Sequence, residues 1–173
     1  QRWYFKSYMR EDLIYILTKK FFIKKKFTLL AGQPPSGSDN LPVIEIKTNK
    51  KEKGSKDSYI PDLVVINYDY IVIVECKPRF NQGDIDKIDE IDKNELRIKN
   101  FYNEILSRNL LIKYNFLNYF NDYETFKNKL RYCLSFNGNF SELEKINIIN
   151  FSDDKDSLFV EAKNSNYKII ISE

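Results

Sequence analysis

Residues 59–80 read YIPDLVVINYDYIVIVECKPRF, and this stretch decides how the chain folds. Two apolar runs, 60–66 and 70–74, flank a short polar break. Short runs rich in Val, Ile and Tyr and bounded by polar residues are typical of strands covered on both faces. The break contains Asn67 and Asp69, residue types that favour turns. We therefore predict that the two runs form a β-hairpin.

The length of the break sets the register of this hairpin. If Tyr68 and Asp69 form its tip, Asp62 lies opposite Glu75, and a four-residue loop over 67–70 gives the same register. Directly opposite residues of antiparallel strands have Cβ atoms about 5 Å apart. Two carboxylates at that separation repel each other, and burial strengthens the repulsion. A positive charge is therefore expected beside them.

Lys77 is the first candidate for that charge. Side chains alternate along a strand, so Lys77 lies on the same face as Glu75, but one ammonium group compensates only one carboxylate. A divalent cation compensates both, and carboxylate oxygens are the ligands that Mg²⁺ and Mn²⁺ prefer. The hairpin thus predicts a cation site formed by Asp62 and Glu75.

The same residues form a known pattern. Pro61-Asp62, followed by Glu75-Cys76-Lys77, resembles the signature of the PD-(D/E)xK nuclease superfamily, which includes restriction endonucleases and Holliday-junction resolvases. The first pair lies in one apolar run and the triplet ends the next, as that signature requires. The resemblance covers 59–80 and extends to 1–30, whereas the rest of the chain matches only in its expected secondary structure.

The resemblance implies a function and roles for these residues. Asp62, Glu75 and the backbone carbonyl of Cys76 would bind Mg²⁺ or Mn²⁺, and Lys77 would position the attacking water and stabilise charge in the transition state. The implied activity is metal-dependent hydrolysis of phosphodiester bonds, with double-stranded DNA as the expected partner. The alternative is a catalytically inactive nuclease-fold module that binds nucleic acid or a partner protein.

A glutamate on the first helix is a further candidate. Holliday-junction resolvases carry a glutamate there that reaches the metal, and the segment EDLI at 11–14 looks similar, which makes Glu11 a candidate catalytic residue. The other interpretation of Glu11 is an exposed charge on a helix. Both interpretations remain open at this point.

Glu45 is a candidate metal ligand through a second hairpin. If this hairpin closes Thr48 on Tyr59, Glu45 lies opposite Asp62. The connecting loop is long, so the register is weakly determined. Glu45 therefore stands beside Glu11 as an open candidate to complete the site.

The periodicity of the remaining chain predicts an αβββαβ order, which is the core that the nuclease family shares. We predict a single α/β, restriction-endonuclease-like domain over 1–173, with a mixed sheet flanked by helices and extra C-terminal strands. The chain begins with Gln1 rather than Met, which allows it to be a piece of a longer protein. The predicted elements are a helix at 3–26, a loop at 31–40, a strand at 41–48, the hairpin, helices at 84–108 and 110–131, and strands at 131–136, 145–151, 157–163 and 167–172.

Composition excludes several kinds of chemistry. The 173 residues contain no histidine, which excludes Ser-His and Cys-His catalysis and His-ligated zinc. The two cysteines, Cys76 and Cys133, lack metal-type spacing, and a reduced, cytoplasmic protein is expected. No apolar run is long enough to span a bilayer, so no membrane partner is expected. Carboxylates and lysines remain for catalysis.

The charge distribution leaves nucleic acid open as a partner. The net charge is only +3, but basic residues concentrate in KKFFIKKK at 19–26 and KTNKKEKGSK at 47–56. These stretches are either solvated surface or phosphate contacts. The sequence also allows a homodimer or a larger assembly.

Overall fold

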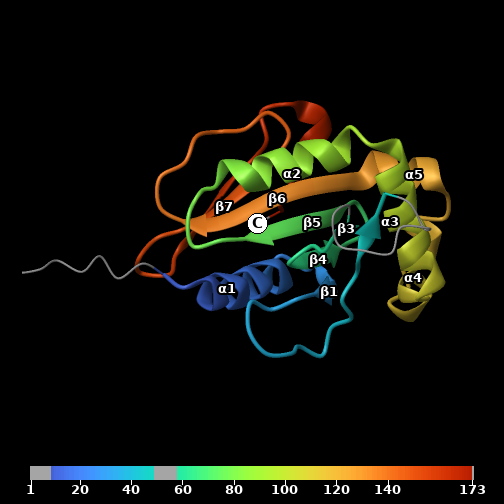
Figure 1. The fold of residues 1–173 in the computed structure, drawn as a ribbon, viewed down its shortest axis with the longest axis horizontal. Coiled ribbons are helices and arrows are strands. Elements are labelled where there is room, and N and C mark those ends of the chain that lie inside the picture. Colours follow the sequence, from blue (N-terminus) through green and yellow to red (C-terminus); the bar gives the residue numbers. More distant parts are fainter. Residues whose placement is uncertain (1–8, 49–57, 173) are drawn as a thin grey trace, which may run out of the picture.

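The computed structural model of the chain describes residues 9–48 and 58–172. The protein is α/β, with a mixed six-stranded sheet and helices on both of its faces (Figure 1). The α-helices are α1 (Glu11–Lys24), α2 (Gln82–Asp92), α3 (Glu95–Ser107), α4 (Leu110–Lys113) and α5 (Tyr123–Lys129). The strands are β1 (Thr28–Gly32), β2 (Ile46–Lys47), β3 (Ser58–Tyr59), β4 (Leu63–Ile66), β5 (Ile71–Cys76), β6 (Leu130–Asn137), β7 (Asn147–Phe151) and β8 (Ser157–Val160).

The sheet has the strand order β1-β4-β5-β6-β7-β8. β4 pairs antiparallel with β1 and with β5. β6 pairs parallel with β5 and with β7, and β8 pairs antiparallel with β7. The predicted hairpin and its register are confirmed, because Val64 pairs with Ile73 and Ile66 with Ile71. Both strands of the hairpin lie in the interior of the sheet, with β1 beside β4 and β6 beside β5.

Two hydrophobic cores cover the two faces of the hairpin. Val64 and Ile73 belong to the core formed with α2 and α3, whereas Val65 and Val72 belong to the core formed with α1. Figure 1 shows α1 on one side of the sheet and α2 on the other. Burial on both faces explains why β4 and β5 read as continuous apolar runs rather than as alternating ones.

The strand predicted at 41–48 is wrong as a member of this sheet. Only β2 forms there, and it pairs with β3 in a separate two-stranded sheet. The place beside β4 belongs to β1, which the sequence did not reveal because its last two residues, Ala31 and Gly32, resemble the start of the loop. The predicted order, a helix followed by three sheet strands, helices and a strand, is observed, but its first sheet strand is β1 instead of the strand predicted at 41–48.

The helical segments are shorter than predicted. The helix expected at 84–108 breaks at Lys93 and Asn94, where the Asn94 side chain accepts a hydrogen bond from Arg97 N and caps α3. The segment at 110–131 contains only α4, a 3₁₀ turn at Leu117–Tyr119 and α5. None of the helices in the described ranges has both the length and the apolar composition needed to cross a lipid bilayer.

The last of the three predicted C-terminal strands, at 167–172, is also wrong. This segment is held instead by the buried side chain of Asn147, whose Oδ1 accepts from Ala162 N at 3.0 Å and Ile169 N at 3.1 Å. The Asn147 Nδ2 group donates to the carbonyls of Tyr132 at 3.0 Å and Tyr167 at 2.8 Å. One amide side chain thus replaces the strand ladder that the apolar pattern suggested.

Asn147→Leu should therefore destabilise the fold strongly. The substitution keeps the side-chain volume but leaves buried backbone groups without partners, and each such group costs about 1–3 kcal/mol. We expect the free energy of unfolding in urea to fall by about 3 kcal/mol or more. Asn121→Leu, at an exposed position, is the control; equal stability of the two variants would contradict this account.

Candidate active site

Three chain segments meet at one end of the sheet. There β5 ends at Cys76, α1 begins at Glu11 and α2 begins at Gln82. In Figure 1 the arrowhead of β5 and the first turns of α1 and α2 lie together on the left. Three of the carboxylates predicted from the sequence, those of Glu11, Asp62 and Glu75, lie at this end.

Asp62 lies directly before β4 and joins the hairpin through its side chain. Its Oδ2 atom accepts a hydrogen bond from the backbone N–H of Cys76 at 2.8 Å, and its own carbonyl accepts from Gln33 N at 2.9 Å. The N–H and C=O of one strand residue point to the same side of the strand, so the Cys76 carbonyl lies on the β4 side of β5. The Cys76 side chain packs in the opposite core, as predicted.

Glu75 is almost completely buried, with 4% of its surface exposed. Its Oε1 atom accepts a hydrogen bond from the hydroxyl of Tyr59, a buried residue of β3. The sequence analysis did not single out Tyr59. Its position depends on the pairing of β3 with β2, for which the sequence analysis assumed a register that differs by two residues from the observed one.

Lys77 links the hairpin to the first helix. Its Nζ atom lies 3.6 Å from Oε1 of Glu11, so the structure brings these two candidates together. Burial lowers the pKa of Lys77, but the nearby carboxylates, led by those of Asp84 and Asp62, raise it above its usual value. Lys77 is therefore a cation at neutral pH and acts as a charge and a hydrogen-bond donor rather than as a base.

Asp84 is a further acid of this cluster that the sequence analysis missed. It lies in the first turn of α2, is 3% exposed, and acts electrostatically on Lys77 and Glu75. Its position in the helical repeat could have revealed it, because Asp84 shares one helix face with Ile88 and Ile91 of the core.

Both hairpin carboxyl groups hold their protons unusually tightly. The pKa of Asp62 is raised to about 6, mainly by burial and to a lesser extent by Glu11 and Asp84, against the opposing effects of Cys76 N–H and Lys77. Burial also raises the pKa of Glu75 to about 8, with Asp84 as the next contribution. Each of these pKa values is raised first by burial, not by repulsion between the two carboxylates as the sequence argument assumed.

Glu45 does not lie where the sequence analysis placed it. Ile46 pairs with Tyr59 and Lys47 with Ser58, which shifts the assumed register by two residues and removes Glu45 from the position opposite Asp62. Glu45 instead lines a polar hollow together with residues of α3. The long loop between the two short strands left this register undetermined.

The basic stretches are only partly described. Residues 3–8 of the predicted first helix and most of the basic loop, at 49–56, lie outside the described residues. The run at 19–26 covers the C-terminal half of α1, and Lys24 at the end of that helix lies about 20 Å from Glu11 along its axis. The C-terminal end of this run is therefore distant from Glu11.

The donor atoms suit a hard divalent cation in kind but are not gathered around one point. Across residues 9–48 and 58–172, no three Asp, Glu or Cys side chains converge closely enough to hold a metal ion. Asp62 and Glu75 are engaged by Cys76 N–H and Tyr59 instead. The cluster also contains Asp84, a residue with 3% of its surface exposed, whose carboxylate oxygens are not among the buried side-chain atoms without a partner in the described residues. Its chemistry fits a cation, and binding would require the two engaged carboxylates to rotate.

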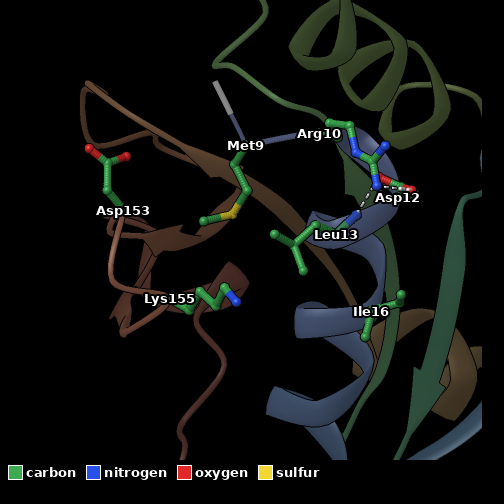
Figure 2. Close-up of a pocket in the computed structure, with 7 residues that line it drawn as sticks. All are labelled: Met9, Arg10, Asp12, Leu13, Ile16, Asp153 and Lys155. Atoms are coloured by element: carbon green, nitrogen blue, oxygen red, sulfur yellow. Dashed lines mark hydrogen bonds and ion pairs between the residues drawn. The ribbon is translucent and has the colours of Figure 1, made fainter. Parts of the chain in front are cut away.

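A hollow of about 380 Å³ borders the first turn of α1 beside this cluster (Figure 2). Figure 2 shows α1 side chains on one side of it and the β7–β8 turn on the other. Its lining residues are Met9, Arg10, Asp12, Leu13, Ile16, Asp153 and Lys155. Glu11 is not among them and pairs with Lys77, so this hollow neighbours the candidate site without forming it.

The comparisons with known proteins assign no family. No protein-family model matches the sequence. A search of curated proteins and a search of solved structures likewise gave no match. Any function must therefore be argued from the residues themselves.

The raised pKa of Glu75 makes stability depend on pH in the metal-free protein. Between its ordinary value of 4.5 and its folded value of about 8, the folded state binds more protons than the unfolded chain. The free energy of unfolding should therefore be highest near the lower value and fall as pH rises toward the upper one. Urea titrations in EDTA across this range measure the slope.

Glu75→Gln should flatten this slope, because glutamine does not titrate. Glu142→Gln, at an exposed position, should leave it unchanged. A slope equally steep in wild type and Glu75→Gln would show that another group is responsible.

Proposed function

We propose that this protein is a metal-dependent nuclease of the PD-(D/E)xK type that hydrolyses DNA. The observation that carries the proposal is the gathering of Asp62, Glu75, Lys77 and Glu11 at the end of one hairpin. These four residues come from two segments separated along the chain. If the sequence pattern were a coincidence, nothing would require Glu11 of the first helix to lie beside Lys77 of the pattern.

The strand order supports the same proposal. The chain gives one helix, three antiparallel sheet strands, helices, and then a strand parallel to β5, if the small β2–β3 pair is set aside as an insertion. This is the αβββαβ order that the sequence resemblance implies. The restriction-endonuclease-like fold is therefore part of the proposal.

The residues of the cluster divide the chemical work. Asp62 and Glu75 would bind Mg²⁺ or Mn²⁺ through their carboxylates, together with the backbone carbonyl of Cys76. A divalent cation supplies polarisation of the phosphate and lowers the pKa of water. Lys77, held as a cation by its acidic neighbours, would donate a hydrogen bond to the attacking water and stabilise negative charge on the phosphate in the transition state. Glu11 would orient Lys77 through their ion pair.

Exposed cations at the same end of the molecule support a phosphate-bearing substrate. Arg10 precedes α1, Lys87 lies on α2, and Lys155 lies in the β7–β8 turn. Contacts of this kind supply affinity for the nucleic-acid backbone without reading its sequence. They support binding on this side of the protein.

One observation favours a second candidate function, an inactive nuclease-fold module that binds nucleic acid or a partner protein. Internal hydrogen bonds engage Asp62 and Glu75, and no three acidic side chains in the described part of the chain converge on one point. If this arrangement is permanent, the cluster binds no cation. Binding without cleavage would then be the only activity.

Lys77→Ala separates the two functions. Wild type should nick supercoiled plasmid in Mg²⁺ or Mn²⁺ and not in EDTA, and Lys77→Ala should lower the cleavage rate by about 10²- to 10³-fold, as expected when one charge-stabilising donor is removed. DNA affinity, measured by fluorescence anisotropy in EDTA, should change little because other contacts supply most of it.

Lys20→Ala, an exposed lysine of α1, is the matched control and should cleave like wild type. If wild type binds DNA and does not cleave it under any metal condition, the binding module is the better account. Equal cleavage by wild type and Lys77→Ala would contradict the proposed role of Lys77.

A further inference from the structure

We infer that the outer edge of β8 pairs with β8 of a second copy of this chain. The pairing is antiparallel and joins two six-stranded sheets into one continuous sheet. It concerns the strand at one edge of the sheet and does not rest on the proposed function.

Backbone groups along β8 are left without partners on its outer side. β8 is the last strand of the sheet and pairs with β7 only. In the turn between them, Ser152 N donates to the Asp156 carbonyl at 2.9 Å. Because hydrogen-bonded and non-hydrogen-bonded pairs alternate along an antiparallel ladder, Leu158 bonds to β7, whereas the N–H and C=O groups of Ser157 and Phe159 point away from it. Within residues 9–48 and 58–172, these outward groups have no hydrogen-bond partner.

The two edges of the sheet differ in how they are protected. At the other edge, β1 has a register shift between Leu29 and Ala31, and Gly32 N donates to the carbonyl of Pro42 in the following loop at 3.0 Å. β8 has a regular register, and its sequence SLFV contains no charged residue and no proline. Bulges, charges, prolines and covering loops are the devices that prevent pairing at an edge strand. β8 lacks the first three, and its Leu158 is 56% exposed.

Leu158 supplies the apolar contact of this interface. Val160 packs against the core formed with α2 and α3, and Phe159 packs against the core formed with α1. Side chains alternate along a strand, so Leu158 lies on the same face as Val160. If a two-fold axis passes beside Leu158, the residue lies opposite its own copy in a non-hydrogen-bonded pair, with Cα atoms about 4.5 Å apart. The two leucine side chains then shield each other from water.

Charge selects this register over the alternative. Two registers combine the largest overlap of β8 with pairing of the outward groups: one places Leu158 opposite its copy, and the other places Phe159 opposite its copy. In the first, Lys155 of the turn lies beside Glu161 of the second copy, and two-fold symmetry repeats this contact at the other end. In the second, Lys155 lies beside Lys163. Opposite charges across paired strands stabilise them and like charges destabilise them, so β8 is complementary to itself in the first register.

Sedimentation velocity of the full chain over a range of concentrations tests the inference. The mass of wild type should rise from that of one chain toward that of two as concentration increases, because a short strand buries little surface and gives a weak dimer. Leu158→Lys places two ammonium groups against each other and should remain monomeric. Ile170→Lys makes the same change at a residue outside β8 that is 63% exposed, and it should dimerise like wild type. Circular dichroism and thermal melting check that each variant is folded.

A charge exchange tests the register. Lys155→Glu and Glu161→Lys should each weaken the dimer by about 5-fold, because each change places like charges together at both ends of the interface. The double variant restores both opposite-charge contacts and should dimerise about as well as wild type. A general loss of folding or of apolar attraction would not be reversed by the second substitution.

Wild type that stays monomeric at every concentration would overturn the inference. A dimer that Leu158→Lys leaves intact would also overturn it, since another surface would then hold the two chains. Stronger association of Lys155→Glu would indicate the register with Phe159 opposite its copy and would contradict the pairing inferred here. Loss of the dimer in Leu158→Lys together with its recovery in the double charge variant supports the inference.

Discussion

The hydrogen bond from Cys76 N–H to Asp62 Oδ2 connects the beginning of β4 to the end of β5. Here a side-chain oxygen takes the place of the backbone carbonyl that would accept from Cys76 N–H in a longer strand pair. The bond therefore fixes a carboxylate at the end of two apolar strands. The register of the hairpin also sets the position of Glu75, because it places Glu75 opposite Asp62 and on the same face of the sheet. Every other charged residue of the candidate site is arranged around this pair.

The cluster is costly to the metal-free fold. Burial raises the pKa of both Asp62 and Glu75, which means that the folded protein disfavours their charged forms. A protein selected only for stability would replace such acids with apolar residues of similar size. Their presence beside Lys77 and Glu11 is understandable if a cation compensates them during function. Stability given up at one end of the sheet is supplied by the two cores along β4 and β5.

Local patterns predicted the hairpin and its register correctly, because turn residues and apolar runs fix a register over a few residues. The same reasoning failed for Glu45, where a long loop separates two short strands and leaves the register free. Tyr59 and Asp84 were missed for a different reason. Tyr59 donates a hydrogen bond to Glu75 from β3, and Asp84 acts electrostatically on Glu75 and Lys77 from α2. The motif lies in the hairpin alone, so it did not point to either residue. The Asn147 side chain likewise replaced a strand that the apolar pattern of the C-terminal segment favoured.

The central claim is that Asp62 and Glu75 share one divalent cation. Anomalous diffraction from crystals soaked in Mn²⁺, collected on wild type and on Asp62→Asn, tests it most directly. The account predicts one strong anomalous peak between the two carboxylates in wild type and its loss in the variant. No peak at this position in wild type, or an equal peak in both proteins, would contradict the account.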